Sequence, residues 1–263
     1  MASIQFGASQ AKQLFPTLGV AGTSTLRLLF ASLMMSVVFR PWRTKLNKSI
    51  LFYGASLGLM NFSFYFALQR IPLGIAVALE FTGPLAIAVF SSKKKVDYLW
   101  AILAAVGITL LLPKIDTHGS LDPVGILLAL LAGLFWALYI IFGKKAGEHH
   151  NGGVIASLGM LTAAALVLPL GISIDGASVF QWSAWPVAIG VALFGSALPY
   201  SLEMIAMKKM PAQTFGVLMS LEPALAALMG YVFLAESLTL TQWLAIGCVM
   251  GSSLGSSLTN RYQ

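Results

Sequence analysis

The stretch GIAVALEFTGPLAIAV, residues 74–89, decides how this chain folds. It is apolar apart from one threonine and one glutamate, Glu80, which stands four residues before Pro84. What a glutamate does in such a run depends on the solvent that surrounds the segment. The composition of the whole chain identifies that solvent.

The chain has 263 residues, of which 58% are hydrophobic and only 10% are charged, and its mean hydropathy is +0.85. A soluble domain carries about 25% charged residues. Apolar runs such as AILAAVGITLLL recur along the chain, near the roughly 20 residues that a membrane-spanning helix needs. A transmembrane β-barrel would alternate apolar and polar residues instead. The sequence therefore predicts an all-α, polytopic membrane helix bundle.

Nine complete spans are predicted, separated by short polar loops. They cover residues 20–39, 50–69, 73–91, 98–112, 123–142, 154–174, 185–207, 214–234 and 242–258. The opening residues MASIQFGASQAK are interpreted as the second half of one more helix, too short to cross a bilayer at about 1.5 Å per residue. The predicted bundle thus has ten spans, the first of them incomplete.

Lysine and arginine predict the orientation of these spans. The loops RPWRTKLNK, SSKKK, GKK and MKKM alternate with loops poor in basic residues, and Arg261 near the C-terminus falls on the side of the basic loops. Only Lys12, Arg70 and Lys114 fall on the other side. The basic side is therefore expected to be cytoplasmic, with the C-terminus there. The net charge of +7 follows from this topology and does not indicate nucleic acid.

An internal repeat relates FALQRIPLGIAVALEFTGPLAIAVF to IAMKKMPAQTFGVLMSLEPALAALM. Pro72 aligns with Pro211 and Pro84 with Pro223 without a gap. The repeat divides the chain into residues 1–117 and 118–263. Each half holds five helices, an odd number, so the halves are expected to run in opposite directions through the membrane. Inverted repeats of this kind are typical of secondary transporters, which bind their solutes near the midplane.

Four ionisable side chains fall within the predicted spans: Arg27, Glu80, Glu203 and Glu222. A charge at a helix centre costs about 3 kcal/mol on insertion scales, and such residues usually face a bundle interior or a watery cavity. Glu80 and Glu222 lie near the middle of their spans, with Arg27 close to that level. Glu203 is about one turn from Lys208, so it could equally reach the cytoplasmic interface.

The prolines strengthen the prediction for Glu80 and Glu222. Pro84 leaves the carbonyl of residue 80 without its helical donor, and Pro223 does the same at the equivalent level of the other half. We therefore expect both helices to kink at Pro84 and Pro223, with Glu80 facing a central cavity. A buried pair between Arg27 and a glutamate, which only holds helices together, is the structural alternative.

Such a cavity suits a small zwitterion, because carboxylates bind its ammonium and an arginine binds its carboxylate. Neutral hydrogen bonds and apolar walls are expected from a further set of residues, each of which could instead serve packing alone: Asn61, Phe64, Tyr65, Trp136, Tyr139 and Tyr200. Burial disfavours the charged form of a carboxyl. Glu80 or Glu222 is therefore predicted to exchange protons and to couple transport to the proton gradient.

Enzymatic interpretations find little support. His118, His149 and His150 all fall in predicted loops, so no histidine is placed to activate a serine within the membrane. The pair in GEHHNGG lacks the further ligands of a zinc site. Cys248 has no partner and is expected to be a small buried hydrophobe. Neither a metal nor a cofactor is expected.

Four stretches carry a resemblance that runs nearly from end to end: ASIQFGASQAKQLFP, PLGIAVALEFTGPLAIAVFSS, ALPYSLEMIA and FGVLMSLEPALAALMGYVFLAE. Through them the chain resembles the EamA-type branch of the drug/metabolite transporter superfamily, and within it the bacterial inner-membrane threonine/homoserine exporters. The resemblance implies ten helices in two inverted five-helix repeats and export of small amino acids from the cytoplasm. Relatives carry a further apolar stretch before the segment that begins here at Met1.

The resulting prediction is an inner-membrane exporter of small amino acids, working by alternating access and in contact with the lipid bilayer. Two alternatives stay open. One is a broader exporter of metabolites or drugs, or an exporter of cysteine or aromatic amino acids; the ammonium-selective carboxylates argue against neutral drugs. The other is a membrane scaffold or sensor without transport activity, for which the short loops offer no attached domain.

Overall fold

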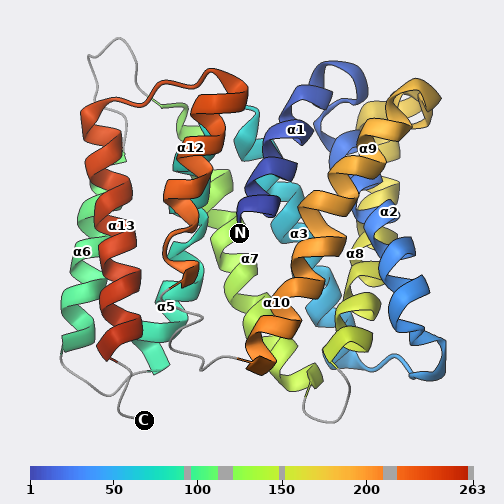
Figure 1. The fold of residues 1–263 in the computed structure, drawn as a ribbon, viewed down its shortest axis with the longest axis horizontal. Coiled ribbons are helices and arrows are strands. Elements are labelled where there is room, and N and C mark those ends of the chain that lie inside the picture. The colour runs from blue at the N-terminus through green and yellow to red at the C-terminus, as the bar shows by residue number, and fades with distance from the viewer. Residues whose placement is uncertain (92–95, 112–120, 148–151, 210–217, 260–263) are drawn as a thin grey trace.

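The computed structural model describes residues 1–91, 96–111, 121–147, 152–209 and 218–259 (Figure 1). Within these ranges the regular structure is entirely helical. The α-helices are α1 (Ala2–Leu18), α2 (Val20–Phe39), α3 (Lys48–Leu68), α4 (Leu73–Glu80), α5 (Thr82–Ser91), α6 (Val96–Leu111), α7 (Pro123–Gly147), α8 (Gly152–Asp175), α9 (Trp185–Ala192), α10 (Leu198–Lys209), α12 (Glu222–Leu234) and α13 (Leu240–Thr259). Four short segments complete the set: η1 (Pro41–Arg43), η2 (Gly176–Phe180), η3 (Trp182–Ala184) and the π-helical η4 (Leu193–Ala197).

Most predicted spans correspond to helices within a few residues, and span 20–39 coincides with α2. Three spans are interrupted. Span 73–91 is divided at Phe81 between α4 and α5, span 185–207 contains the π-helical η4 between α9 and α10, and span 214–234 is interrupted at Ser220–Leu221, before α12. Pro211, His118, His149, His150 and the basic residues at 93–95, 114 and 261 lie outside the described ranges.

The first helix is longer than the sequence indicates. The opening partial helix is predicted over MASIQFGASQAK, but α1 runs on through Pro16 to Leu18. The proline stands in the last turn, and the helix ends two residues after it. The chain turns at Gly19, whose φ of 74° favours glycine. Asp175 then accepts a hydrogen bond from the backbone N–H of Gly22 at 2.7 Å, in the first turn of α2.

Three pairs of helices pack side by side in antiparallel fashion: α2 with α8, α4 with α12, and α6 with α13. In the second pair, Glu236, just after the end of α12, accepts a hydrogen bond from the backbone N–H of Leu73 at the start of α4. In the third, Trp100 near the start of α6 donates to Thr259 at the end of α13, with 3.0 Å between the two atoms.

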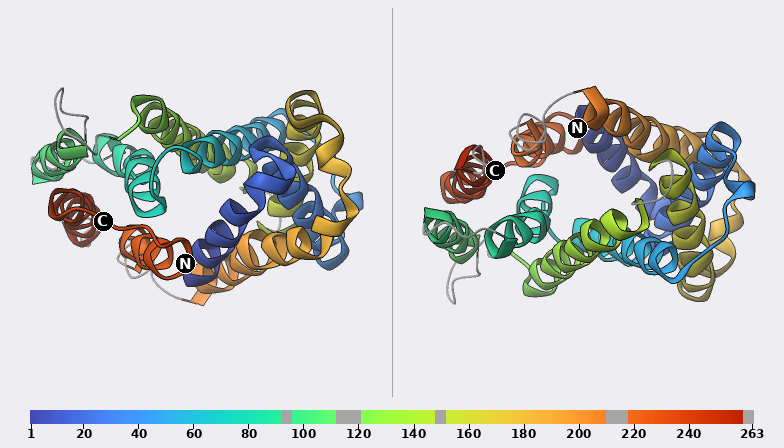
Figure 2. Two further views of the ribbon diagram at one scale, coloured as in Figure 1. Left: turned by 90° about the horizontal axis from the view of Figure 1, so that it is seen from above. Right: turned by 90° about the horizontal axis from the view of Figure 1, so that it is seen from below.

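Seen along the helices, the bundle is elongated, with α6 and α13 at one end and α2, α8 and α9 at the other (Figure 2). The middle is built by α3 packed along α7 and by α1 packed against η4 and α12. Helices from the two halves of the chain thus alternate, and neither half forms a separate lobe.

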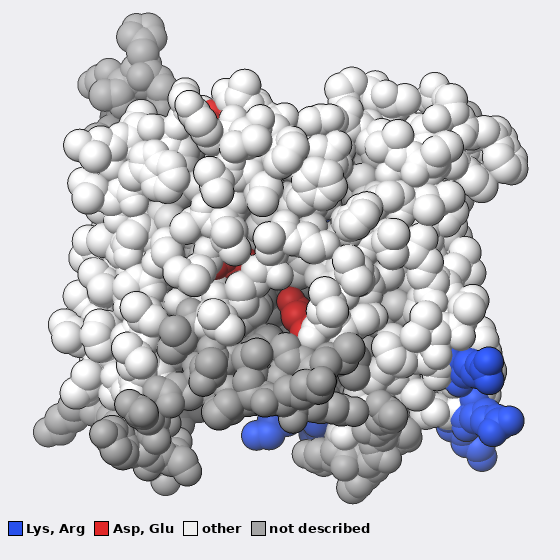
Figure 3. Space-filling view, in the orientation of Figure 1, with Lys and Arg blue, Asp and Glu red and all other residues white. Residues whose placement is uncertain are grey.

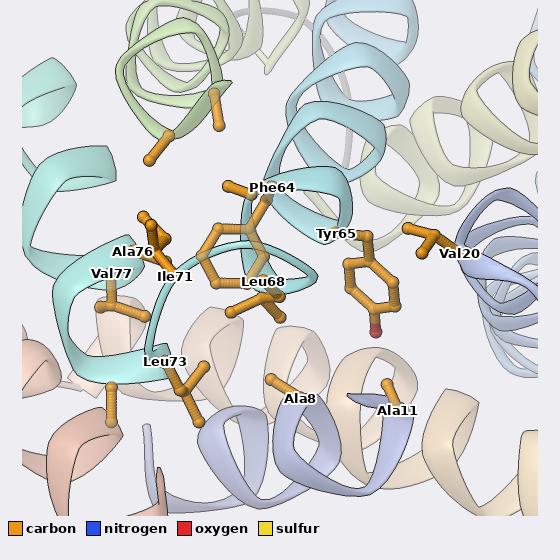
Figure 4. Packing of buried hydrophobic residues seen from close by; sticks show 14 of the residues in the cluster. Ala8, Ala11, Val20, Phe64, Tyr65, Leu68, Ile71, Leu73, Ala76 and Val77 are labelled. Carbon is orange, nitrogen blue, oxygen red and sulfur yellow. The ribbon is translucent and has the colours of Figure 1, made fainter. Parts of the chain in front are cut away.

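The largest buried cluster lies where α1, α3 and α4 meet (Figure 4). Tyr65 and Leu68 of α3 are fully buried there, between Ala11 of α1 and Leu73 at the start of α4. The alanines of α1 allow its backbone to lie close to the aromatic side chains of α3. This contact joins α1 to α3, in addition to the packing of α1 against η4 and α12.

The outer surface is apolar, as expected for helices in contact with lipid. Among the described residues, 5 helices are long and apolar enough to cross a membrane, and shorter apolar helices accompany them. Lys and Arg side chains gather at the lower edge of the face in Figure 3, whereas acidic side chains are visible near its middle. The molecule is therefore a membrane protein with charged groups at mid-height.

Glycines allow close helix contacts, which membrane helices use because lipid provides no hydrophobic driving force between them. Gly83 at the start of α5 lies directly against the backbone of Gly133 in α7. A methyl group at Gly133 would in turn lie 2.7 Å from the carbonyl oxygen of Glu80. The backbone at the Phe81 interruption therefore packs directly against the α7 backbone at Gly133, which has no side chain to separate the two helices.

We expect Gly133→Ala to destabilise the protein by about 1–3 kcal/mol, because the added methyl group would overpack this contact. Gly190→Ala is the matched control, since Gly190 has nothing within 4 Å of an added Cβ. Alanine is the better helix former, so the control is expected to be neutral or slightly stabilising. Thermal unfolding of the two purified variants in detergent measures the difference, and equal midpoints would contradict the packing argument.

Candidate functional site: a charged cavity at mid-height

A cavity of about 440 Å³ lies at the centre of the bundle. Its walls come from α1, α2, α3, α4, α5, α7, α10, α12 and α13, so both halves of the chain contribute. The sequence-predicted site residues that line it are Arg27, Asn61, Glu80, Pro84, Tyr200, Glu203 and Glu222. Pro223 is buried beside Glu222 but does not line the cavity. Phe64, Trp136 and Tyr139 contribute the walls.

Arg27 is 6% exposed and is held by neutral partners. Its Nε donates to the Ser196 hydroxyl at 2.8 Å, one terminal nitrogen to the Gly195 carbonyl at 2.7 Å, and the other to the Tyr65 hydroxyl at 2.9 Å. The guanidinium carbon also lies 5.1 Å from the centre of the Tyr65 ring. These contacts orient the guanidinium and leave some of its N–H groups for a further acceptor.

The alternative of a structural pair between Arg27 and a glutamate is not realised. Among the described residues, no carboxylate oxygen lies within 4.0 Å of Arg27. Its partners are a hydroxyl, a phenol and a backbone carbonyl, none of which neutralises the guanidinium. A buried cation without an anionic partner is costly, so this position favours binding of an anion.

The π-helical segment η4 provides two of these three partners. Its glycine, Gly195, packs against Gly7 of α1, which places the η4 backbone directly beside the first helix. A single π-helical turn within an α-helix occurs frequently at functional sites, where it alters the direction of carbonyls and side chains. Here it presents the Gly195 carbonyl and the Ser196 hydroxyl to α2.

Glu80 and Glu222 each stand at an interrupted helix. Glu80 is the last residue of α4, and Glu222 is the first residue of α12. The interruptions fall at Phe81 and at Ser220–Leu221, just before Pro84 and Pro223. Each proline therefore stands in the first turn of the following helix, where its missing N–H breaks no helical hydrogen bond.

The two carboxyls are buried, with Glu80 8% and Glu222 3% exposed. Neither has a basic side chain within 4.0 Å among the described residues, although Glu80 is near enough to Glu222 and Arg27 to interact with both charges. The Gln5 side chain of α1 contacts the Glu222 carboxyl. Glu80, Glu222 and Arg27 thus face one cavity, which Glu203 also lines, and none of these three is neutralised by a direct ion pair within the described residues.

A second cavity of about 310 Å³ adjoins the first. Glu203, Tyr139, Ile140 and Tyr200 line both cavities. The second one extends to Gly147 and Gly152, at the ends of α7 and α8 that flank a predicted cytoplasmic loop. Glu203 therefore lies between the central cavity and the basic side of the molecule.

Ion pairs join elements on the side that is poor in basic residues. Lys12 of α1 contacts Glu236 at 2.6 Å, and Glu236 also accepts from the Leu73 N–H at 2.8 Å. Nearby, Arg70 contacts Asp122 at 2.7 Å, and this hydrogen bond lowers the pKa of the Asp122 carboxyl. These contacts tie α1, the start of α4 and the α12–α13 connection together on one side of the cavity.

The sequence interpretation missed four polar residues that line the cavity: Gln5, Ser253, Ser256 and Ser257. The signal for the serines is present, because positions i, i+3 and i+4 share one face of a helix. The run GSSLGSS in α13 has this spacing. Gln5 lies in the opening segment, for which the sequence predicts no complete helix.

An apolar helix bundle with a charge-bearing cavity at mid-height, built from interrupted helices, is the architecture of a membrane transporter. The chain belongs to the EamA-like transporter family, whose model matches residues 123–258. Membership of a transporter family agrees with the prediction that the chain is not an enzyme.

The similarity to individual relatives extends further than this match. The chain is 49% identical to the threonine/homoserine exporter RhtA of Escherichia coli K12, over 99% of this chain and 90% of that protein. The RhtA of Salmonella typhimurium LT2 gives the same values. A protein of Archaeoglobus fulgidus described as an uncharacterized transporter is 27% identical over 87% of this chain and 83% of its own length.

Among solved structures, one crystal structure superposes with a TM-score of 0.62 at 18% sequence identity. The match covers 98% of this chain and 96% of the other chain. At this identity it supports the fold of the chain alone.

Proposed function

We propose that this protein exports small amino acids, threonine and homoserine in particular, across the bacterial inner membrane by alternating access. The observation that carries the proposal is the central cavity, where unneutralised Arg27 faces the same space as Glu80 and Glu222. A free amino acid is a zwitterion with one group for each of these charges. The relatives named as threonine/homoserine exporters support the choice of substrates.

The substrate carboxylate is assigned to Arg27, whose remaining N–H groups provide charge-assisted hydrogen bonds. The ammonium is assigned to Glu80 and Glu222. Asn61, Tyr200 and Glu203 complete the substrate-binding or proton-coupling set, and Tyr200 and Glu203 also line the second cavity. An exchange of protons by the glutamates, alternating with binding of the ammonium, would couple export to proton entry.

Alternating access would rest on two inverted five-helix repeats, residues 1–117 and 118–263. The antiparallel packing of α2 with α8, α4 with α12 and α6 with α13 supports this division, because these are equivalent elements of the two halves. The contact of α3 with α7 likewise has its counterpart in the contact of α1 with α9 and η4. A two-fold axis in the membrane plane predicts both sets of contacts.

The proposed topology places the loops rich in Lys and Arg, and the C-terminus, in the cytoplasm. Glu203 and the second cavity then face the compartment from which the substrate is taken. The Lys12–Glu236 and Arg70–Asp122 pairs lie on the outer side and would have to separate when the cavity opens outward.

Transport by the purified protein tests the proposal. In proteoliposomes preloaded with unlabelled threonine, we expect accumulation of labelled threonine and homoserine by counterflow, and no accumulation in protein-free vesicles. In cells, expression is expected to confer resistance to toxic homoserine and to increase its efflux. Flux of neutral drugs alone, or a protein that carries no solute and co-purifies with a partner, would contradict it.

A further inference from the structure

Two buried side chains that contact each other at the central cavity each carry an oxygen without a hydrogen-bond partner. Gln5 of α1 contacts the carboxyl of Glu222, the first residue of α12, and α1 packs against α12. Gln5 Oε1 and Glu222 Oε2 nevertheless have no partner among the described residues, although both side chains are only 3% exposed. Such atoms are rare in folded proteins, and each requires an explanation. Since both residues line the cavity, a ligand in that space would complete the two oxygens.

The two free oxygens restrict the chemistry of that ligand. An amide oxygen and an ionised carboxylate oxygen both accept hydrogen bonds, so the ligand has to donate at least twice. The Glu222 carboxyl has no ion pair within the described part of the chain, which favours a cationic donor. A primary ammonium meets both conditions, because it is charged, donates three hydrogen bonds and requires no donor in return.

One nitrogen can reach both oxygens. With N–H···O distances of about 2.8 Å, an ammonium bridges two acceptors that lie up to about 5.5 Å apart. The terminal atoms of an amide or a carboxyl share one carbon and lie about 1.2–1.3 Å from it. A separation of this size is therefore compatible with the observed contact between the Gln5 amide and the Glu222 carboxyl.

A second glutamine of α1 serves helix packing alone. The side-chain nitrogen of Gln13 donates to the Phe233 carbonyl of α12 at 3.1 Å. Gln13 is exposed and does not line the cavity. Both glutamines thus join α1 to α12, but Gln5 does so beside the cavity and with a buried acceptor left free. Gln13 therefore provides an internal control on the same helix.

We infer that Gln5 is a further substrate-binding residue, whose amide oxygen accepts a hydrogen bond from the substrate ammonium beside Glu222. The inference rests on the proposed function, which assigns the ammonium to Glu80 and Glu222, and it adds a third acceptor from the first helix. Three acceptors match the three N–H donors of a primary ammonium. The site should therefore prefer a primary amine over an N-methylated one, because the methyl group leaves a buried acceptor unpaired.

N-Methylthreonine, which has one N–H fewer than threonine, tests this assignment. Its methyl group is expected to lie toward Gln5, the neutral acceptor of the three. In proteoliposome counterflow, we expect the wild-type protein to prefer threonine by at least about 10-fold. Gln5→Met removes the amide and should lower this ratio to within about 3-fold, through a higher KM for threonine. Gln5→Asn withdraws the amide by one methylene group and should change the ratio in the same direction.

Gln13→Met is the matched control and should keep the wild-type ratio, because its amide lies outside the cavity. Continued transport of N-methylthreonine by Gln5→Met reports that the variant is folded. The assignment of Gln5 is wrong, while amino-acid export stands, if the wild-type protein carries both solutes equally well. It is equally wrong if the two Gln5 variants keep the wild-type ratio or slow both solutes to the same extent. If the wild-type protein carries neither solute nor homoserine, the proposed function fails and this inference with it.

Discussion

Replacing Arg27 by lysine is expected to reduce threonine transport by about 100-fold, although the positive charge is kept. Lysine cannot donate at once in the directions of Ser196, Gly195 and Tyr65, so its ammonium would not be held toward the cavity. A lost charge-assisted contact in a buried site is worth about 3 kcal/mol, which corresponds to this factor. Counterflow at saturating and subsaturating threonine measures the loss.

Two controls separate substrate binding from folding. Arg70→Lys alters an arginine of an ion pair outside the cavity, where the side chain is 42% exposed, and transport should stay within about 2-fold of the wild type. Threoninamide lacks the carboxylate assigned to Arg27, so its residual competition for binding should be insensitive to Arg27→Lys. Wild-type threonine transport by Arg27→Lys would exclude the assignment of the substrate carboxylate to this residue.

Glu80→Gln and Glu222→Gln are expected to abolish transport driven by a pH gradient. Glutamine keeps the shape of the side chain but can neither carry the charge nor exchange the proton. Since the ammonium is assigned to these two carboxyls, each variant should also weaken substrate binding, by about 10- to 100-fold. Uptake into inverted membrane vesicles with an imposed pH gradient measures the first effect, and counterflow without a gradient measures the second.

Asp122→Asn provides the control for loss of a carboxylate outside the cavity. Asp122 is partly exposed and pairs with Arg70, so the variant should retain gradient-driven uptake. Unchanged gradient-driven rates in both glutamine variants would rule out proton coupling through Glu80 and Glu222. If only one variant loses gradient-driven uptake, the carboxyl replaced in that variant exchanges the proton, and the other carboxyl binds the substrate ammonium.

Most helices could be predicted from the sequence, because a helix that crosses the bilayer needs a minimum number of consecutive apolar residues. It also predicted the ionisable side chains of the cavity, since an ionisable residue at mid-span has few other tolerable positions. Arg27, Glu80, Glu203 and Glu222 come from four helices, α2, α4, α10 and α12, and all four line one cavity. Glu203 could not be assigned from its depth alone, because Lys208 is only about one turn away.

Other features of the site depend on tertiary packing that the sequence pattern does not report. The π-helical η4 has the same apolar character as its flanking α-helices, so periodicity gives no sign of it. The partners of Arg27 likewise depend on α2 and η4 meeting across the bundle. A glutamate was the expected alternative partner, whereas the structure provides Ser196, Gly195 and Tyr65.

The contacts of Arg27 have a consequence for biogenesis. Gly195 and Ser196 are synthesised 168 and 169 residues after this arginine. At about 5–20 residues per second, a nascent chain would hold the guanidinium in the membrane for roughly 10–30 seconds before these partners emerge. Chains arrested within that window should be bound by membrane insertases or degraded by quality-control proteases, and Arg27→Leu should lengthen their lifetime.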